Sequence, residues 1–187
     1  MANSGAIRGD KVYPAGPITY LTVNEIIPFR NEVVSIEMNG TDLKQLLEIS
    51  ASALRVQGDE CPDNSRAGSG GFFQMAGLRI TIDLSKPSFC AVYLERGISK
   101  LINPGSRILK AEVYLNGSWT PLDPSVTYTV LVNKWTASGG DGYYVLLRED
   151  IPKENTTMFS TDILAGYIQR HTPISPQTEG RIDFVDK

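Results

Sequence analysis

Histidine and cysteine are scarce in this chain of 187 residues, which has one histidine, His171, and two cysteines, Cys61 and Cys90. A catalytic zinc or dinuclear metal centre draws on several His or Cys ligands together with carboxylates. A Ser-His-Asp triad would have to use His171, which lies just before Thr-Pro at the end of a helical pattern, where a solvated helix terminus is the simpler interpretation. No Gly-x-Ser-x-Gly elbow supplies a nucleophile. We therefore predict neither catalytic machinery nor a metal site in this chain.

The chain also lacks an excess of positive charge and any long apolar run. Its formal net charge of −3 argues against a nucleic-acid-binding surface. No apolar run is long enough to cross a bilayer, and we recognise no signal peptide at the start. With 41% hydrophobic and 21% charged residues, the composition is that of a globular domain. The length predicts one domain, covering residues 1–187.

Two segments have the 3.6-residue apolar period of an amphipathic helix, 41–54 and 161–170. Thr41 is the expected cap of the first helix, and Ser160 or Thr161 that of the second. A shorter helix is predicted to open at a capping box that starts at Thr22.

Strand-like runs lie between these helices, without the regular alternation that a doubly wound parallel sheet requires. We predict strands at 32–38, 72–77, 78–84, 107–115, 128–132 and 179–185, with surface loops at 57–71 and 85–106. This mixture predicts an α+β fold in which sheets and helices form layers.

The most informative stretch follows the apolar run 128–132. Trp135 lies just beyond the strand end, and the turn Gly139-Gly140-Asp141-Gly142 comes soon after. Glycines in such a turn provide positive φ angles or a close approach to a ligand. The carboxylate of Asp141 can accept two hydrogen bonds from a vicinal diol, and Trp135 offers a flat face to a planar ring. The alternative is a turn in which Asp141 bonds its own backbone and Trp135 packs in the core.

Two further segments carry weaker signals. In the first, Asn3, Gly5 and Arg8 are close together, and the Arg8 guanidinium suits a phosphate or carboxylate, although a plain surface arginine is the alternative. In the second, Phe72 and Phe73 are adjacent. Because alternate residues of a strand face opposite sides, one ring is expected in the core while the other is free.

Several of these pieces, in this order, resemble the C-terminal domain of the 5′-nucleotidase and UDP-sugar hydrolase family. The similarity extends from residue 3 to about residue 183. The matching motifs are Asn3-x-Gly5-x-Ile7-Arg8, Ile27-Pro28-Phe29, the strand-turn-helix from Gly40 to Leu47, Phe72-x-Gln74-x-x-Gly77, Ala137-x-Gly139-Gly140-Asp141-Gly142 and Glu179-Gly180-Arg181-Ile182.

The resemblance implies a layered α/β/β/α-type sandwich of mixed sheets flanked by helices. It also implies a two-domain enzyme whose N-terminal metallophosphoesterase domain, absent from this chain, holds two divalent metal ions. This chain would then bind the nucleotide substrate, pack against that N-terminal domain, and be inactive alone. Other implied activities are hydrolysis of UDP-sugars or of 2′,3′-cyclic nucleotides, while a stand-alone nucleoside-binding module is an alternative of a different class.

The resemblance also assigns roles to single residues. The implied substrate-binding set is Asn3, Arg8, Phe72, Trp135, Gly139, Gly140 and Asp141. Phe72 and Trp135 match the two aromatic residues that enclose the nucleobase, and Asp141 matches the carboxylate that holds the ribose hydroxyls. Asn3 matches a residue near the base, and Arg8 one that reaches the phosphate or ribose. Trp135 stands where the family usually has Phe.

Family members work in the periplasm, at the cell surface or outside the cell, and these compartments are oxidising. On that basis we expect a disulfide between Cys61 and Cys90, which closes a loop of about 30 residues. Two unpaired cysteines remain the alternative.

Overall fold

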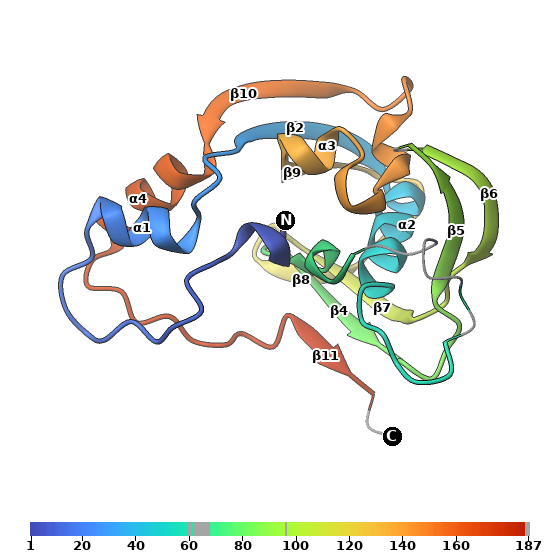
Figure 1. Cartoon of the computed structure of the whole chain (residues 1–187), viewed down its shortest axis with the longest axis horizontal. Coiled ribbons are helices and arrows are strands. Elements are labelled where there is room, and N and C mark those ends of the chain that lie inside the picture. The colour runs from blue at the N-terminus through green and yellow to red at the C-terminus, as the bar shows by residue number, and fades with distance from the viewer. Residues whose placement is uncertain (60, 62–67, 96, 186–187) are drawn as a thin grey trace.

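A computed structural model describes residues 1–59, 61, 68–95 and 97–185 (Figure 1). Its helices are α1 (Tyr20–Ile26), α2 (Gly40–Ala51), α3 (Lys134–Ala137) and α4 (Ser160–His171). Its strands are β1 (Ala2–Asn3), β2 (Glu32–Asn39), β3 (Phe73–Gln74), β4 (Leu78–Ile82), β5 (Phe89–Leu94), β6 (Gly97–Pro104), β7 (Ile108–Leu115), β8 (Ser118–Pro121), β9 (Thr127–Asn133), β10 (Lys153–Phe159) and β11 (Ile182–Phe184). Short 3-10 turns are η1 (Ser4–Ala6), η2 (Ser69–Gly71), η3 (Gly140–Gly142) and η4 (Tyr144–Leu147).

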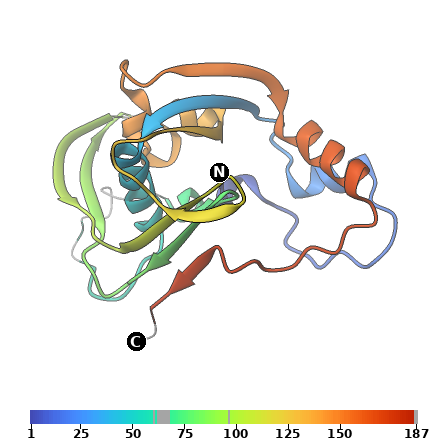
Figure 2. The ribbon, with the colours of Figure 1, turned by 180° about the vertical axis from the view of Figure 1, so that it is seen from behind.

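The strands form several sheets. The sheet β10-β2-β9 is antiparallel, while β11-β4-β7-β8 is mixed, because β11 runs parallel to β4. Two further pairs are β1-β3 and β5-β6. The two larger sheets lie on opposite sides of the molecule, with α1 and α4 together at one end and the β5-β6 hairpin at the other (Figures 1 and 2). The predicted α+β class is confirmed.

Helix α2 is the centre of the core. Leu43, Leu46, Leu47 and Ile49 are at most 1% exposed, and burying each such side chain contributes about 1.5–3 kcal/mol. The helix packs against strands β2, β5 and β7, so it is covered on more than one side. The predicted helix with its 3.6-residue apolar period is therefore confirmed, although it ends at Ala51 rather than at residue 54.

The predicted helix caps were wrong in detail. Helix α2 is capped by Asn39, whose side chain accepts a 2.8 Å hydrogen bond from the Asp42 N–H. In the same way Thr19 caps α1, which begins at Tyr20, before the predicted capping box. Helix α4 begins at Ser160, one residue before the predicted start, and its cap residue Phe159 makes no side-chain cap hydrogen bond. Each true cap has extended backbone angles, which a sequence pattern does not reveal.

The segment 85–106, predicted as a loop, instead forms the hairpin β5-β6. Phe89 and Ala91 are fully buried, whereas Leu94 is 68% exposed near the tip of the hairpin. The apolar run in β5 is a strand signal that the surrounding Ser, Pro and Gly residues concealed. The expected hairpin at 116–117 is confirmed, with φ of 51° at Asn116 and 83° at Gly117.

The expected disulfide is present: Cys61 bonds Cys90 on β5, with 5.9 Å between the two Cα atoms. Next to it lies a buried ion pair. The guanidinium of Arg107 is fully buried and contacts the Asp59 carboxylate at 2.5 Å. A buried charge is tolerated only when it is paired and hydrogen-bonded. The disulfide thus anchors the chain only two residues from the carboxylate that neutralises Arg107.

Loss of the disulfide should destabilise the fold. The bridge joins residues 29 positions apart, a closure that contributes about 3–4 kcal/mol on the chain-entropy model. Urea unfolding of the Cys61→Ser/Cys90→Ser variant should therefore give a lower free energy of unfolding by about that amount. Thiol titration of the unreduced, unfolded wild type is the control, and finding two free thiols would contradict the bond.

Candidate functional site

The turn at η3 has the backbone that its glycines predict. The φ angles are 79° at Gly139, 57° at Asp141 and 87° at Gly142, all in the left-handed region. Gly140 is needed for space instead, because a Cβ atom there would lie 2.3 Å from Nε1 of Trp135. The turn therefore allows the indole to lie directly against the backbone beside Asp141.

Trp135 lies on the short helix α3, at the end of strand β9. The side-chain oxygen of Asn133 caps this helix by accepting a 2.8 Å hydrogen bond from the Thr136 N–H. The Trp135 side chain is 47% exposed. It is therefore not a core residue, and the alternative that placed it there is wrong.

Asp141 is held by a residue from the other end of the chain. The side-chain Nδ2 of Asn3 donates a 2.7 Å hydrogen bond to Oδ2 of Asp141. Asn3, at the end of β1, receives in turn a 2.7 Å hydrogen bond on its Oδ1 from Nδ2 of Asn133. Asn3 and Asp141 were both predicted site residues and are brought together. Asn133 was not predicted, although its place at a strand end before a helix is a signal for a capping residue.

Two tyrosine hydroxyls connect the turn region to neighbouring segments. The Tyr93 hydroxyl donates to the Gly142 carbonyl at 3.1 Å, and the hydroxyl of the fully buried Tyr143 donates to the Gly71 carbonyl. Burial raises the pKa of both phenols above its usual value. A free phenol is already protonated at neutral pH, and burial moves the ionisation of these two further from that range.

The free face expected of Phe72 is not found. Its side chain is only 8% exposed, and Phe73 is fully buried and stacks on Tyr143 with 4.3 Å between ring centroids. Phe72 lies just before β3, and the N–H and hydroxyl of Ser4 both donate to its carbonyl. Because this segment is covered on both sides, the strand alternation does not leave one ring free.

Arg8 and Phe29 form a second exposed group. The Arg8 guanidinium lies over the Phe29 ring, 5.4 Å from its centroid, an arrangement typical of a cation–π contact. The backbone N–H of Arg8 donates to the Ile26 carbonyl at 2.7 Å, which connects this segment to the end of α1. Phe29 is 53% exposed. It belongs to a motif on which the resemblance depends, but it was not assigned a role from the sequence.

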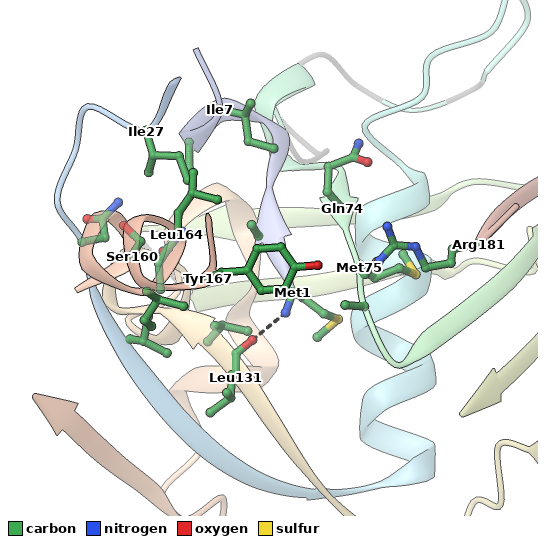
Figure 3. A pocket seen from close by; sticks show the side chains of 18 residues that line it. Met1, Ile7, Ile27, Gln74, Met75, Leu131, Ser160, Leu164, Tyr167 and Arg181 are labelled. Atoms are coloured by element: carbon green, nitrogen blue, oxygen red, sulfur yellow. Dashed lines mark hydrogen bonds between the residues drawn. The ribbon is translucent and has the colours of Figure 1, made fainter. Parts of the chain in front are cut away.

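A cavity of about 510 Å³ lies nearby, between the N-terminal segment, β9 and α4 (Figure 3). Most of its 18 lining residues are apolar, and Arg181 points in from the opposite side to Tyr167. The N-terminal amino group of Met1 donates to the Leu131 carbonyl at 2.7 Å on this wall. The cavity borders Asn133, but the residues described around it include neither Trp135 nor Asp141, and none of them has a carboxylate side chain.

The two groups offer side chains suited to binding. In the first, Asp141 supplies acceptor oxygens and Trp135 a flat aromatic surface. In the second, Phe29 supplies another aromatic surface and Arg8 a positive charge. Over the described parts of the chain, no His, Cys, Asp and Glu side chains gather in a group that could hold a metal ion. Within the same residues, no helix has the length and apolar content needed to cross a membrane.

The known proteins to which this chain is similar include several nucleotidases. A snake venom 5′-nucleotidase from Macrovipera lebetinus is 28% identical over 192 residues, covering 100% of this chain and 40% of the relative. Among solved structures, the 5′-nucleotidase precursor from Thermus thermophilus matches with a TM-score of 0.78 and 30% identity over all of this chain and 31% of that one. The NAD nucleotidase of Haemophilus influenzae matches with a TM-score of 0.74 and 25% identity, over 98% and 29%.

These relatives are longer proteins, of which this chain spans two fifths or less. A sequence model described as 5′-nucleotidase, C-terminal domain matches residues 1–148. The match includes Asn3, Trp135 and the turn that carries Asp141. The chain therefore belongs to the 5′-nucleotidase C-terminal domain family.

Proposed function

We propose that this chain is the nucleoside-binding domain of a 5′-nucleotidase that hydrolyses nucleoside phosphates to nucleoside and phosphate. The observation that carries the proposal is the position of Asp141, whose carboxylate is oriented by Asn3 within the turn that contacts Trp135. A carboxylate accepts hydrogen bonds from the two ribose hydroxyls, and an indole stacks on a nucleobase. Gly139 and Gly140 allow the turn that places these two groups together.

The second stacking surface is better provided by Phe29 than by Phe72. The exposed fraction of the side chain is 53% for Phe29 and 8% for Phe72, so a base could reach Phe72 only after the surrounding packing opened. Phe29 also carries the Arg8 guanidinium over its ring. This arrangement would place a positive charge for the phosphate or ribose beside an aromatic face for the base.

Bond cleavage belongs to another part of the parent protein. An N-terminal metallophosphoesterase domain with two divalent metal ions would activate the attacking water, and this chain would position the nucleotide. A periplasmic or extracellular location is supported by the Cys61–Cys90 disulfide, since such bonds persist in oxidising compartments. The snake venom relative agrees with that location.

The isolated chain is expected to hydrolyse no nucleotide, with or without added divalent metal. Its described residues offer no cluster of metal ligands, and the whole chain has one histidine. Phosphate release from AMP and from UDP-glucose, each with Mg²⁺, Mn²⁺ or Zn²⁺, is the measurement. Robust turnover by the purified chain would contradict this division of roles.

The stacking residues can be identified by fluorescence. The chain has two tryptophans, so Trp119→Phe leaves Trp135 as the reporter. Adenosine should quench its emission, and Phe29→Ala should weaken adenosine binding by about 5- to 150-fold, since base stacking contributes about 1–3 kcal/mol.

Phe72→Ala is the matched control in the same background. It should lower the free energy of unfolding, as expected for a buried aromatic residue, with little change in affinity where the protein is folded. If Phe72→Ala weakened adenosine binding and Phe29→Ala did not, Phe72 would be the stacking residue instead.

The role of Asp141 is tested with Asp141→Asn, because Asn tolerates the left-handed backbone found there. Losing a hydrogen bond to a charged acceptor costs about 1.5–3 kcal/mol, so adenosine should bind roughly 10- to 150-fold more weakly. Binding of 2′,3′-dideoxyadenosine should change little, because it lacks the diol. Equal losses of affinity for both ligands would show that Asp141 does not bind the ribose hydroxyls.

A further inference from the structure

Asn133 touches both halves of the proposed site. Its side-chain oxygen accepts from the Thr136 N–H at 2.8 Å and so caps helix α3, which carries Trp135. Its side-chain nitrogen donates to Oδ1 of Asn3 at 2.7 Å, and Nδ2 of Asn3 donates to Asp141 at 2.7 Å. One amide thus connects the stacking helix to the carboxylate through a single intermediate residue.

The direction of this chain of hydrogen bonds is determined by its two ends. A backbone N–H, here that of Thr136, can only donate, so the Asn133 atom that faces it must be the oxygen. An ionised carboxylate, here that of Asp141, can only accept, so the Asn3 atom that faces it must be the nitrogen. With both ends set, each of the two amides has one possible orientation, and rotating either amide would break two hydrogen bonds.

Burial makes the arrangement rigid. Asn3 is 5% exposed and Asn133 is 7% exposed, so neither side chain can readily replace a lost partner with water. An unsatisfied buried polar group is strongly unfavourable. The donor to Asp141 is therefore the Asn3 amide, whose position is set by the residue that caps α3, and not an exchangeable water molecule.

We propose that Asn133 is a positioning residue, which orients the Asp141 carboxylate for the ribose diol by way of Asn3. The inference rests on the proposed nucleoside-binding function and adds a residue to it that contacts no substrate. Asn133 performs two separable tasks, because its oxygen caps α3 while its nitrogen fixes the orientation of Asn3. The two tasks can be separated by substitution.

The variant Asn133→Asp keeps the cap and removes the donor. Asp caps helices about as well as Asn, so α3 and Trp135 should stay in place. Asn3 would then turn its nitrogen toward the new carboxylate and its oxygen toward Asp141, which misplaces the acceptor for the diol. In the Trp119→Phe background we expect adenosine affinity to fall about tenfold. Affinity for 2′,3′-dideoxyadenosine should stay within about twofold, and the amplitude of Trp135 quenching at saturation should be unchanged.

A double-mutant cycle tests whether Asn133 acts through Asp141. If it does, Asn133→Asp should cause no further loss of adenosine affinity in the Asp141→Asn background. Wild-type-like adenosine binding by Asn133→Asp would overturn the proposal. Equal losses for adenosine and its dideoxy analogue, or additive losses in the cycle, would also overturn it, because they indicate a general structural role. If Asn133→Asp fails to fold, Asn133→Ser, which caps but is too short to reach Asn3, serves in its place.

Failure of the proposed function gives a different result. In that case the wild type would bind neither nucleoside, and NMR of the ligand-free protein would decide the role of Asn133. The side-chain NH₂ signals of Asn3 and the carboxyl ¹³C signal of Asp141 should both shift in Asn133→Asp. Unchanged signals would overturn the positioning role, whereas shifted signals would support it even without nucleoside binding.

Discussion

The need to satisfy buried polar groups is the constraint on which this structure depends. The fold buries Asn3, Asn133, Glu48 and Arg107, each less than 9% exposed, and each would be costly without a partner. Glu48, on the central helix α2, accepts from the backbone N–H groups of Arg107 and Ile108 at 2.9 and 3.0 Å. Its burial raises the pKa of the carboxyl, and those two hydrogen bonds oppose the rise.

The two groups of buried polar residues connect different parts of the molecule. Around Glu48 and Arg107, they join the central helix to the start of β7 and to the segment held by the disulfide. Around Asn3 and Asn133, they join the N-terminal strand to the end of β9 and to the turn with Asp141. The first group joins parts of the core, and the second supplies a hydrogen bond to the half-buried carboxylate of Asp141. Both use the same physical rule, that a low-dielectric interior strengthens a satisfied hydrogen bond.

The sequence was sufficient to predict features that depend on local pattern. The apolar period of α2, the strand before Trp135, the 116–117 turn and the glycine turn around Asp141 all follow from neighbouring residues. Features that depend on contacts between distant segments were missed or misassigned. Strand alternation predicts one free ring at Phe72 and Phe73, but the contact with Ser4 and the surrounding core cover both. The β5-β6 hairpin was missed because turn residues flank its apolar run.

Asn133 shows most clearly why the rest could not be predicted. Its side-chain nitrogen bonds Asn3, 130 positions before it, and Asn3 in turn bonds Asp141, 138 positions after Asn3, so only the fold brings the three together. The helix cap is a local signal, but the hydrogen bond to Asn3 is not. A sequence pattern can therefore indicate that Asn133 caps α3, yet it cannot indicate which residue its nitrogen reaches.

The arrangement also has a consequence for selectivity. In the nucleoside site that we propose, stacking on Trp135 would use the flat face that every base has, so it would discriminate weakly between bases. A carboxylate held by Asn3 would discriminate strongly, since a missing hydroxyl would leave an oriented acceptor unpaired. If Asp141 were free to rotate, it could turn to water when the diol was absent, and the penalty would be small. With its orientation set by a buried amide, as we propose, the site should select for the ribose more than for the base.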